Sequence, residues 1–221
     1  MADKINKQNG VIWFDKTGLS IYLENKPFLR LNFPTDAFTN LEIINKVKLE
    51  SLIRSFINQN NLSYLSFLII ITPDILFEKD WLLPQTEVQK KEETDFIDSI
   101  PFENTVTHFW IKNNKKKLIA TNQDFIFFLK EVFEKDNGHL IGAFPYSLFD
   151  ANVRNESVKE IWKKMNLLKQ HNLMEINSNQ LTIKSSVDNK QGSDKNRSSL
   201  PLLIGVFVIL ITILGFLLFK K

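Results

Sequence analysis

The sequence predicts a mixed α/β (α+β) body, followed by a flexible linker and one transmembrane helix. Short alternating segments near the N-terminus are separated by turn residues. Two later segments carry apolar residues at helical spacing, and residues 200–219 form an apolar stretch without charge. The first observation is typical of strands, the second of amphipathic helices and the third of a membrane span.

Three strands are expected over residues 11–33. The segments VIWFD, LSIYLE and PFLRLNF are separated by Lys16-Thr17-Gly18 and by Asn25-Lys26-Pro27, which are typical turn sequences. A helix follows, because apolar residues recur at i, i+3, i+4, i+7 and i+8, namely at Leu49, Leu52, Ile53, Phe56 and Ile57. The apolar run SFLIIITP at 66–73 then predicts a strand covered on both faces. The resulting order over 11–80, βββαβ, opens the ribonuclease H-like and actin-like folds.

Residues 86–150 are predicted to be a second part of the same domain, which spans 1–150. We expect an acidic helix over 88–100, strands over 105–111 and 118–121, a helix capped by Asn122 and a strand over 139–145. The apolar stripe of the second helix consists of Phe125, Phe128, Leu129, Val132 and Phe133. Three lysines at 115–117 fall where we expect a hairpin tip, and we interpret them as part of a solvated turn.

A smaller third section is expected over residues 151–184. Ser157 and Glu160 have the spacing of a capping box, and the apolar stripe behind it consists of Val158, Ile161, Trp162, Met165 and Leu168. The segments LMEI and LTIK, around Asn177-Ser178-Asn179, predict a hairpin. Residues 185–199 are polar and include five serines, which indicates a flexible linker.

Residues 200–219 are the predicted transmembrane helix. Sixteen of these twenty residues are Leu, Ile, Val or Phe, and a bilayer core needs about 20 predominantly apolar residues in helical form. Residues expected within the membrane include Leu200, Leu203, Phe207, Leu210, Leu214 and Phe219. Basic residues flank both ends, so the positive-inside rule does not fix the orientation. The first ten residues contain no stretch of signal-peptide type, so we expect a single-pass protein of the cell (inner) membrane with a cytoplasmic N-terminal domain.

The charge of the body argues against a nucleic-acid partner. The net charge is +3, and without Lys220 and Lys221 the chain has 26 basic and 25 acidic residues, or +1. The sequence has no cysteine and no P-loop, GxGxxG or GxSxG motif. Its histidines, His108, His139 and His171, lie far apart without helical ligand spacing, so we expect surface or packing roles and predict no metal or cofactor.

Three carboxylates raise one alternative. Asp15 ends the first strand, Glu50 lies on the first helix and Asp74 follows the buried strand. In a ribonuclease H-like sheet, acids at such places converge on two Mg²⁺ ions, which would make the protein a nuclease. Acids are also common at strand ends and on solvated helix faces. The balanced charge and the membrane anchor fit nuclease work poorly, so we favour the second interpretation.

Three short segments carry a resemblance to a known family. Ile100-Pro101-Phe102 follows an acidic helix, Leu118–Thr121 lies in the second strand of a pair, and Gly142–Pro145 lies in the last strand. In these features residues 96–149 resemble the actin-like PilM proteins of type IV pilus assembly and the cytoplasmic part of the related GspL proteins of type II secretion. With the βββαβ opening, the resemblance covers about residues 11–149 and implies half of an actin-like fold.

The chain departs from the family where a nucleotide would bind. The family carries an acidic residue, a Gly-Ser-rich turn and a lysine between its first two strands, and these hold phosphate. Here the place reads FDKTGLS, in which only Asp15 and Gly18 match, as a degenerate remnant of the phosphate loop. The second half of the actin-like fold is not found after residue 150. We therefore expect no ATP binding and no enzymatic activity, with a residual ATPase as an alternative.

The resemblance implies a membrane-anchored, non-enzymatic assembly scaffold of a type IV pilus or type II secretion-like machine. It would dock cytoplasmic and inner-membrane components, and its expected partners are the lipid bilayer and pilus or secretion assembly proteins. The interpretation also allows a homodimer and predicts no nucleic acid. The alternative is a tail-anchored adaptor that recruits an unrelated cytosolic protein.

Half of a fold should leave an apolar surface. Several phenylalanines lie outside the predicted stripes, namely Phe14, Phe28, Phe77 and Phe127, and the run Ile126-Phe127-Phe128 makes its helix apolar on more than one face. Either a partner or the small third section covers this surface. The sequence leaves both possibilities open.

Overall fold

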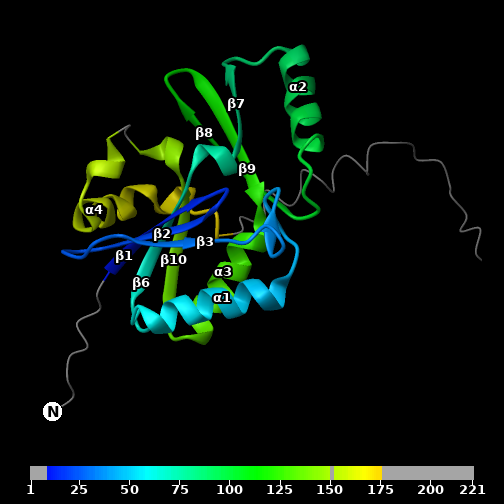
Figure 1. The fold of residues 1–221 in the computed structure, drawn as a ribbon. Coiled ribbons are helices and arrows are strands. Elements are labelled where there is room, and N and C mark those ends of the chain that lie inside the picture. The colour runs from blue at the N-terminus through cyan, green and yellow to red at the C-terminus, as the bar shows by residue number, and fades with distance from the viewer. Residues whose placement is uncertain (1–8, 150–151, 176–221) are drawn as a thin grey trace, which may run out of the picture. The chain divides into compact units, whose positions relative to one another are not determined.

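A five-stranded sheet with helices on both faces forms the centre of the computed structural model, and a smaller three-stranded sheet stands beside it (Figure 1). The structure describes residues 9–149 and 152–175, which belong to one structural unit. The strands of the large sheet are β1 (Asn9–Asp15), β2 (Gly18–Leu23), β3 (Leu29–Asn32), β6 (Ser66–Ile71) and β10 (His139–Pro145). The helices are α1 (Lys46–Gln59), α2 (Glu87–Asp98), α3 (Gln123–Lys135) and α4 (Val158–Leu168).

The strand order of the large sheet is β10-β6-β1-β2-β3. β2 runs antiparallel to both of its neighbours, whereas β6 runs parallel to β1 and to β10. A short hairpin of β4 (Phe38–Thr39) and β5 (Glu42–Ile43) interrupts the chain before α1. Apart from that hairpin the chain opens with three strands, a helix and a buried strand, so the predicted βββαβ order and α/β fold class are confirmed.

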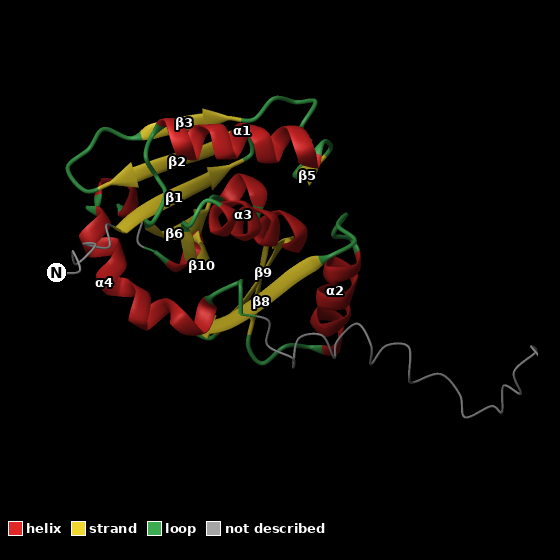
Figure 2. Cartoon of the chain, turned by 90° about the horizontal axis from the view of Figure 1, so that it is seen from below, coloured by secondary structure: helices red, strands yellow, loops and turns green. Residues whose placement is uncertain are grey.

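Helices α1 and α3 cover one face of the large sheet, and α4 covers the other (Figure 2). Because side chains alternate along β1, they enter two different cores. Ile12 and Phe14 join the first core, which lies between the sheet and helices α1 and α3. Val11 and Trp13 join the second core, which lies between the sheet and α4. Central strand β6 is buried along its whole length, as its continuous apolar run predicts. The large sheet is therefore buried on both faces, under α1 and α3 on one and under α4 on the other.

The third section packs on the sheet and also closes one of its edges. Val158 and Ile161 of α4 are buried against the second face, and Trp162 donates its indole N–H to the carbonyl of Gly10 at 3.0 Å. At the β10 edge, the backbone N–H of Ala143 donates to Oδ1 of Asn172 at 3.0 Å, and Leu173 N–H donates to the Ala143 carbonyl at 2.9 Å. The sequence left open whether a partner or the third section covers the apolar surface. On this face of the sheet, the third section covers it.

The phenylalanines outside the predicted stripes have different surroundings. Phe14 is buried in the first core, while Phe77 and Phe127 are half-buried. Phe28 is 59% exposed and stacks on Tyr22, with their ring centroids 5.7 Å apart. Ile126 and Phe128 are both buried, so α3 is apolar on more than one face because it lies in the core.

The small sheet has the order β7-β9-β8, with bounds Phe77–Leu82, Lys115–Asn122 and Thr105–Lys112. Helix α2 packs on one of its faces, where Phe96 meets Trp81 edge to face. Strand β7 was not predicted from the sequence. The placement of the lysines was wrong: Asn113 and Asn114, with φ of 51° and 59°, form the turn, and Lys115, Lys116 and Lys117 lie in β9.

Some predictions concern residues outside the described ranges. The linker over 185–199, the membrane span over 200–219 and most of the hairpin over 173–184 belong to these. The described start of that hairpin, residues 173–175, forms a turn. Within 9–149 and 152–175, no helix combines the length and the apolarity that a membrane crossing requires.

Candidate functional site

The turn between β1 and β2 holds the two residues predicted to be a phosphate-loop remnant. Asp15 accepts hydrogen bonds from Nη1 and Nη2 of Arg30, at 2.6 and 3.0 Å, and from the backbone N–H of Thr17 at 2.8 Å. Burial alone would raise the pKa of Asp15, but these hydrogen bonds outweigh it and lower the pKa to about 2. The carboxylate thus pairs with an arginine on β3, which lies beyond β2 in the sheet.

Gly18 has a packing role in the same turn. Its φ is +152°, and a Cβ atom built on it would lie 2.0 Å from the carbonyl oxygen of Leu31 on β3. Beside it, the backbone N–H of Lys16 donates to Oδ2 of Asp74 at 3.1 Å. At this end of the sheet, the backbone N–H groups of the turn therefore donate to Asp15 and Asp74 of the chain itself. In a phosphate-binding loop, such N–H groups would point at the ligand.

The third predicted carboxylate lies elsewhere. Glu50 on α1 pairs with Lys135 on α3, with Oε1 and Nζ 2.9 Å apart. The structure thus brings Asp74 to the turn that follows Asp15, whereas Glu50 pairs with a lysine of another helix. Among the described residues, no three His, Cys, Asp or Glu side chains are grouped so that they could hold a metal ion.

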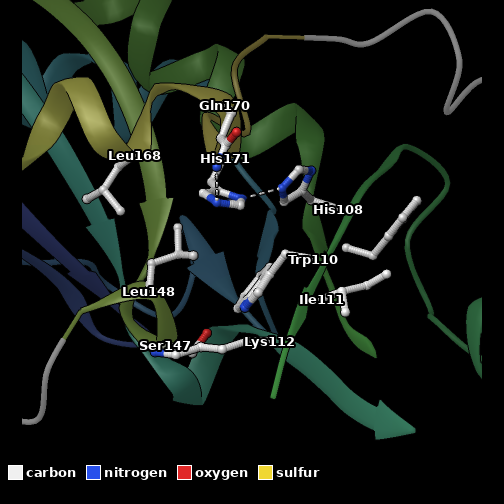
Figure 3. A pocket seen from close by; sticks show the side chains of 10 residues that line it. His108, Trp110, Ile111, Lys112, Ser147, Leu148, Leu168, Gln170 and His171 are labelled. Carbon is white, nitrogen blue, oxygen red and sulfur yellow. Dashed lines mark hydrogen bonds between the residues drawn. The ribbon is translucent and has the colours of Figure 1, made fainter. Parts of the chain in front are cut away.

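A cavity of about 510 Å³ lies between β8 and the segments on either side of α4 (Figure 3). One wall comes from β8, another from the 3₁₀ helix Tyr146–Leu148 after β10, and a third from Leu168 and the 3₁₀ helix Lys169–His171. Trp110, Leu148 and Leu168 supply apolar surface, while Lys112 and Ser147 supply polar groups. The lining therefore offers both apolar contacts and polar groups.

Two histidines meet at one side of this cavity. Nε2 of His108, on β8, lies 2.8 Å from Nδ1 of His171, and Trp110 packs against both rings (Figure 3). Burial and the neighbouring His171 lower the pKa of His108 to about 4, and burial lowers the pKa of His171. Both imidazoles are therefore neutral at pH 7. No pattern in the sequence predicts this pair beyond the alternation that puts His108 and Trp110 on one face of a strand.

A polar network holds the small sheet to the segment after β10. The hydroxyl of Ser147 donates to Oε1 of Glu78 at 2.7 Å, and Lys117 lies 3.3 Å from Glu78 and 3.1 Å from Asp80. Burial alone would lower the pKa of Lys117, but its bonds with the two carboxylates raise it. The lysine therefore stays charged and links β7, β9 and the cavity wall.

Strand β8 presents an unpaired edge to the cavity. It pairs with β9, and no other described strand pairs with it. Lys112 and Lys115 close a two-residue turn, so their pair is hydrogen-bonded and such pairs recur at every second residue. The N–H and C=O groups of Phe109 and Ile111 therefore point away from β9. Both residues line the cavity, although the side chain of Ile111 points away from it (Figure 3).

Comparison with known proteins gives likenesses in structure alone. No family model and no curated protein sequence matches the chain. The chain is similar to a PilM–PilN type IV pilus biogenesis complex, with a TM-score of 0.41, 10% identity, and coverage of 59% of this chain and 45% of that one. It is also similar to the cytoplasmic domain of EpsL, an inner membrane component of the type II secretion system of Vibrio cholerae, with a TM-score of 0.39, 8% identity, and coverage of 62% and 57%.

A third similar structure is a Bacteroides thetaiotaomicron protein of unknown function with an actin-like ATPase fold. Its TM-score is 0.35, the identity is 17%, and the match covers 63% of this chain and 55% of that one. The chain thus spans about half the length of the solved structures it matches. Proteins of type IV pilus biogenesis and type II secretion, the groups named in the resemblance above, are thus among these neighbours.

Proposed function

We propose that the chain is a non-enzymatic scaffold in the assembly of a type IV pilus or a type II secretion-like machine. In this proposal, residues 200–219 anchor it in the inner membrane, and the body docks cytoplasmic and membrane components from the cytoplasmic side. The neighbours named above support an assembly-related role by analogy of fold alone. The cavity beside β8 supports it through its own residues.

The unpaired edge of β8 along this cavity is the observation that carries the proposal. An exposed strand edge can accept an extended peptide through main-chain hydrogen bonds, and pockets beside it select the side chains. Trp110, Leu148 and Leu168 form an apolar pocket, and Lys112 offers a positive charge at its rim. The occupant we propose is an extended segment of an assembly protein, with one apolar side chain and a carboxylate nearby.

The turn between β1 and β2 supports a role without catalysis. Asp15 is engaged by Arg30, and Asp74 accepts the N–H of Lys16, so both carboxylates serve the turn itself. A nucleotide phosphate would have to compete with these carboxylates for the same donors. A scaffold function does not require a phosphate to displace these carboxylates.

A membrane anchor would strengthen weak docking. Attachment to the same bilayer as its partners raises the effective concentration of a binding segment without any new contact. We therefore propose transient docking that depends on the shared membrane.

Site-specific crosslinking in cells tests the proposal. A photoreactive amino acid replaces Gln170 at the cavity, and a matched variant carries it at Val47, which is 79% exposed on α1. The proposal expects adducts with pilus or secretion assembly proteins from position 170 only, and loss of these adducts when Leu168→Asp places a charge in the apolar pocket. Adducts with unrelated cytosolic proteins alone would replace the scaffold with a tail-anchored adaptor. Equal adducts from both positions would remove the cavity from the argument.

A further inference from the structure

Helix α4 presents a lysine-rich side away from the large sheet. Its apolar stripe is buried against the second face of the sheet, whereas Lys159, Lys163 and Leu167 are exposed. Because these three residues are spaced four apart, they form one line along the outer side of the helix. Leu167 is 77% exposed and lines a shallow hollow together with the exposed Lys169. We call Lys159, Lys163, Leu167 and Lys169 the α4 face.

The lysines of the α4 face lack the partners that lysines across the sheet have. Helix α1 covers the opposite side of the large sheet, and there both Lys46 and Lys48 pair with a carboxylate (Figure 2). Among the described residues, no carboxylate forms an ion pair with Lys159, Lys163 or Lys169. Like charges four residues apart, as at Lys159 and Lys163, destabilise a helix slightly. An anionic partner would remove this repulsion.

The carboxylates near this face are bonded elsewhere. Glu160 accepts from the backbone N–H and the hydroxyl of Ser157, at 2.9 and 3.0 Å. Glu24 accepts the backbone N–H of Lys159 at 3.1 Å, and Glu156 pairs with another lysine of the helix at 2.6 Å. The side-chain charges of the α4 face therefore remain available to an anionic partner.

Exposed apolar side chains accompany these charges. Tyr22 lines a hollow of about 150 Å³ together with Val158 at the start of α4, and the exposed ring of Phe28 stacks on Tyr22. At the other end of the helix, Leu167 is the exposed apolar residue. Basic residues combined with exposed aromatic and leucine side chains are typical of a surface that lies on a lipid headgroup layer.

We propose that the α4 face docks the body on an anionic phospholipid surface, with its lysines over the headgroups and Leu167 entering the headgroup region. This proposal rests on the anchor in the proposed function. Residues 176–199 span at most about 85 Å even when fully extended, so an anchor at 200–219 would keep the body near the bilayer.

The strength of such docking follows from the number of lysines. The cytoplasmic leaflet is negatively charged, and each lysine close to it strengthens binding about fivefold, so three lysines give about 100-fold. Docking would also bring Leu168 and Gln170, which follow Leu167 and line the cavity beside β8, towards the membrane. Membrane components of an assembly machine would meet the cavity there.

Fluorescence quenching in lipid nanodiscs tests the α4 face. The chain has no cysteine, so Leu167→Cys carries a single fluorophore, and lipids with a nitroxide on the headgroup act as quenchers. The full-length protein is placed in discs of phosphatidylcholine alone, or of phosphatidylcholine and phosphatidylglycerol in about equal parts. Val47→Cys is the matched control, because Val47 is 79% exposed and lies between the paired Lys46 and Lys48.

The proposal expects quenching at position 167 only in discs that contain phosphatidylglycerol. Quenching should be lost in about 1 M salt, where the Debye length falls to about 3 Å. Lys159→Gln combined with Lys163→Gln should lower the ratio of docked to undocked protein by about 25-fold. Position 47 should not be quenched in either kind of disc.

Equal quenching at position 167 in the two kinds of disc would overturn the proposal and leave the face to an acidic protein. Quenching that both high salt and the glutamine substitutions leave unchanged would overturn it too, and the salt measurement decides even if the double variant fails to fold. Discs that do not take up the chain would refute the anchor. Cosedimentation with vesicles of the same two compositions then tests the α4 face, and binding that does not depend on phosphatidylglycerol would refute it. Crosslinking from position 170 reports on the protein partner, so the two proposals fail separately.

Discussion

Replacing Asp15 with Asn should remove a measurable part of the stability of the β1–β2 turn. A pKa lowered from 3.8 to about 2 corresponds to about 2 kcal/mol of unfolding free energy at neutral pH. The carboxylate is 28% exposed and its partner Arg30 is 25% exposed, so solvent screening is limited. Because the folded-state pKa is the lower one, this contribution is complete above pH 4 and disappears as the pH falls towards 2. Roughly half of it should remain at pH 3.

Urea unfolding of the full chain in mild detergent, followed by tryptophan fluorescence, measures this contribution. The loss in Asp15→Asn should be about 2 kcal/mol at pH 7 and about half of that at pH 3, and the double-mutant cycle with Arg30→Gln gives the part of it that Arg30 supplies beside Thr17. Asp36→Asn is the control, because Asp36 pairs with Lys48 on the surface and should contribute less than about 1 kcal/mol. A coupling energy near zero at pH 7, or one that does not fall with pH, would refute the reasoning.

Two further variants test the packing. Gly18→Ala should lower the unfolding free energy by at least about 2 kcal/mol, because its Cβ would meet a backbone oxygen and its φ disfavours other residues; a variant of normal stability in urea would show that β3 does not approach so closely. Ile161→Ala should cost about 2–5 kcal/mol if α4 is docked on the sheet, whereas Leu167→Ala, at a residue 77% exposed, should change stability by less than about 0.5 kcal/mol. Equal thermal stability of these two variants would contradict the docking of α4.

Elements with a buried apolar stripe were predictable from the sequence. Helices α3 and α4 begin where their capping residues predict, with Asn122 accepting from the N–H groups of the first turn and Ser157 forming a capping box with Glu160. Strand β6 shows its burial directly in its composition. Local chemistry and tertiary packing favour the same structure in these segments, and sequence reasoning works under that condition.

Strand β7 was missed because its apolar pattern is masked by charge. Phe77 and Trp81 face α2, but Glu78 and Asp80 alternate with them and look like surface loop residues. Their carboxylates are compensated by Lys117, which lies on the adjacent strand β9. The lysine run was misplaced for the same reason, because a charged residue reveals its partner only after the strands are paired.

The candidate site was less predictable than the fold. His108 and His171 are 63 positions apart, and only the packing of the small sheet beside the segment after α4 brings them together. Asp15 was singled out from the sequence, but its partner Arg30 lies on β3, and the pairing needs the antiparallel register of β1, β2 and β3. Sites assembled across elements depend on topology, which spacing along the chain does not contain.

A comparison of the sheet edges indicates where a partner strand would add. At the β10 edge, Asn172 and Leu173 already bond to Ala143, and the β3 edge is only four residues long. Neither edge therefore offers a long row of free main-chain N–H and C=O groups. The β7 edge carries three consecutive charged residues, Glu78 to Asp80, which disfavour strand addition. β8 is eight residues long, and its exposed Phe109 and Ile111 lie beside the cavity. Since α4 also covers the second face of the large sheet, the junction beside β8 is the place where a scaffold of this shape would receive a peptide.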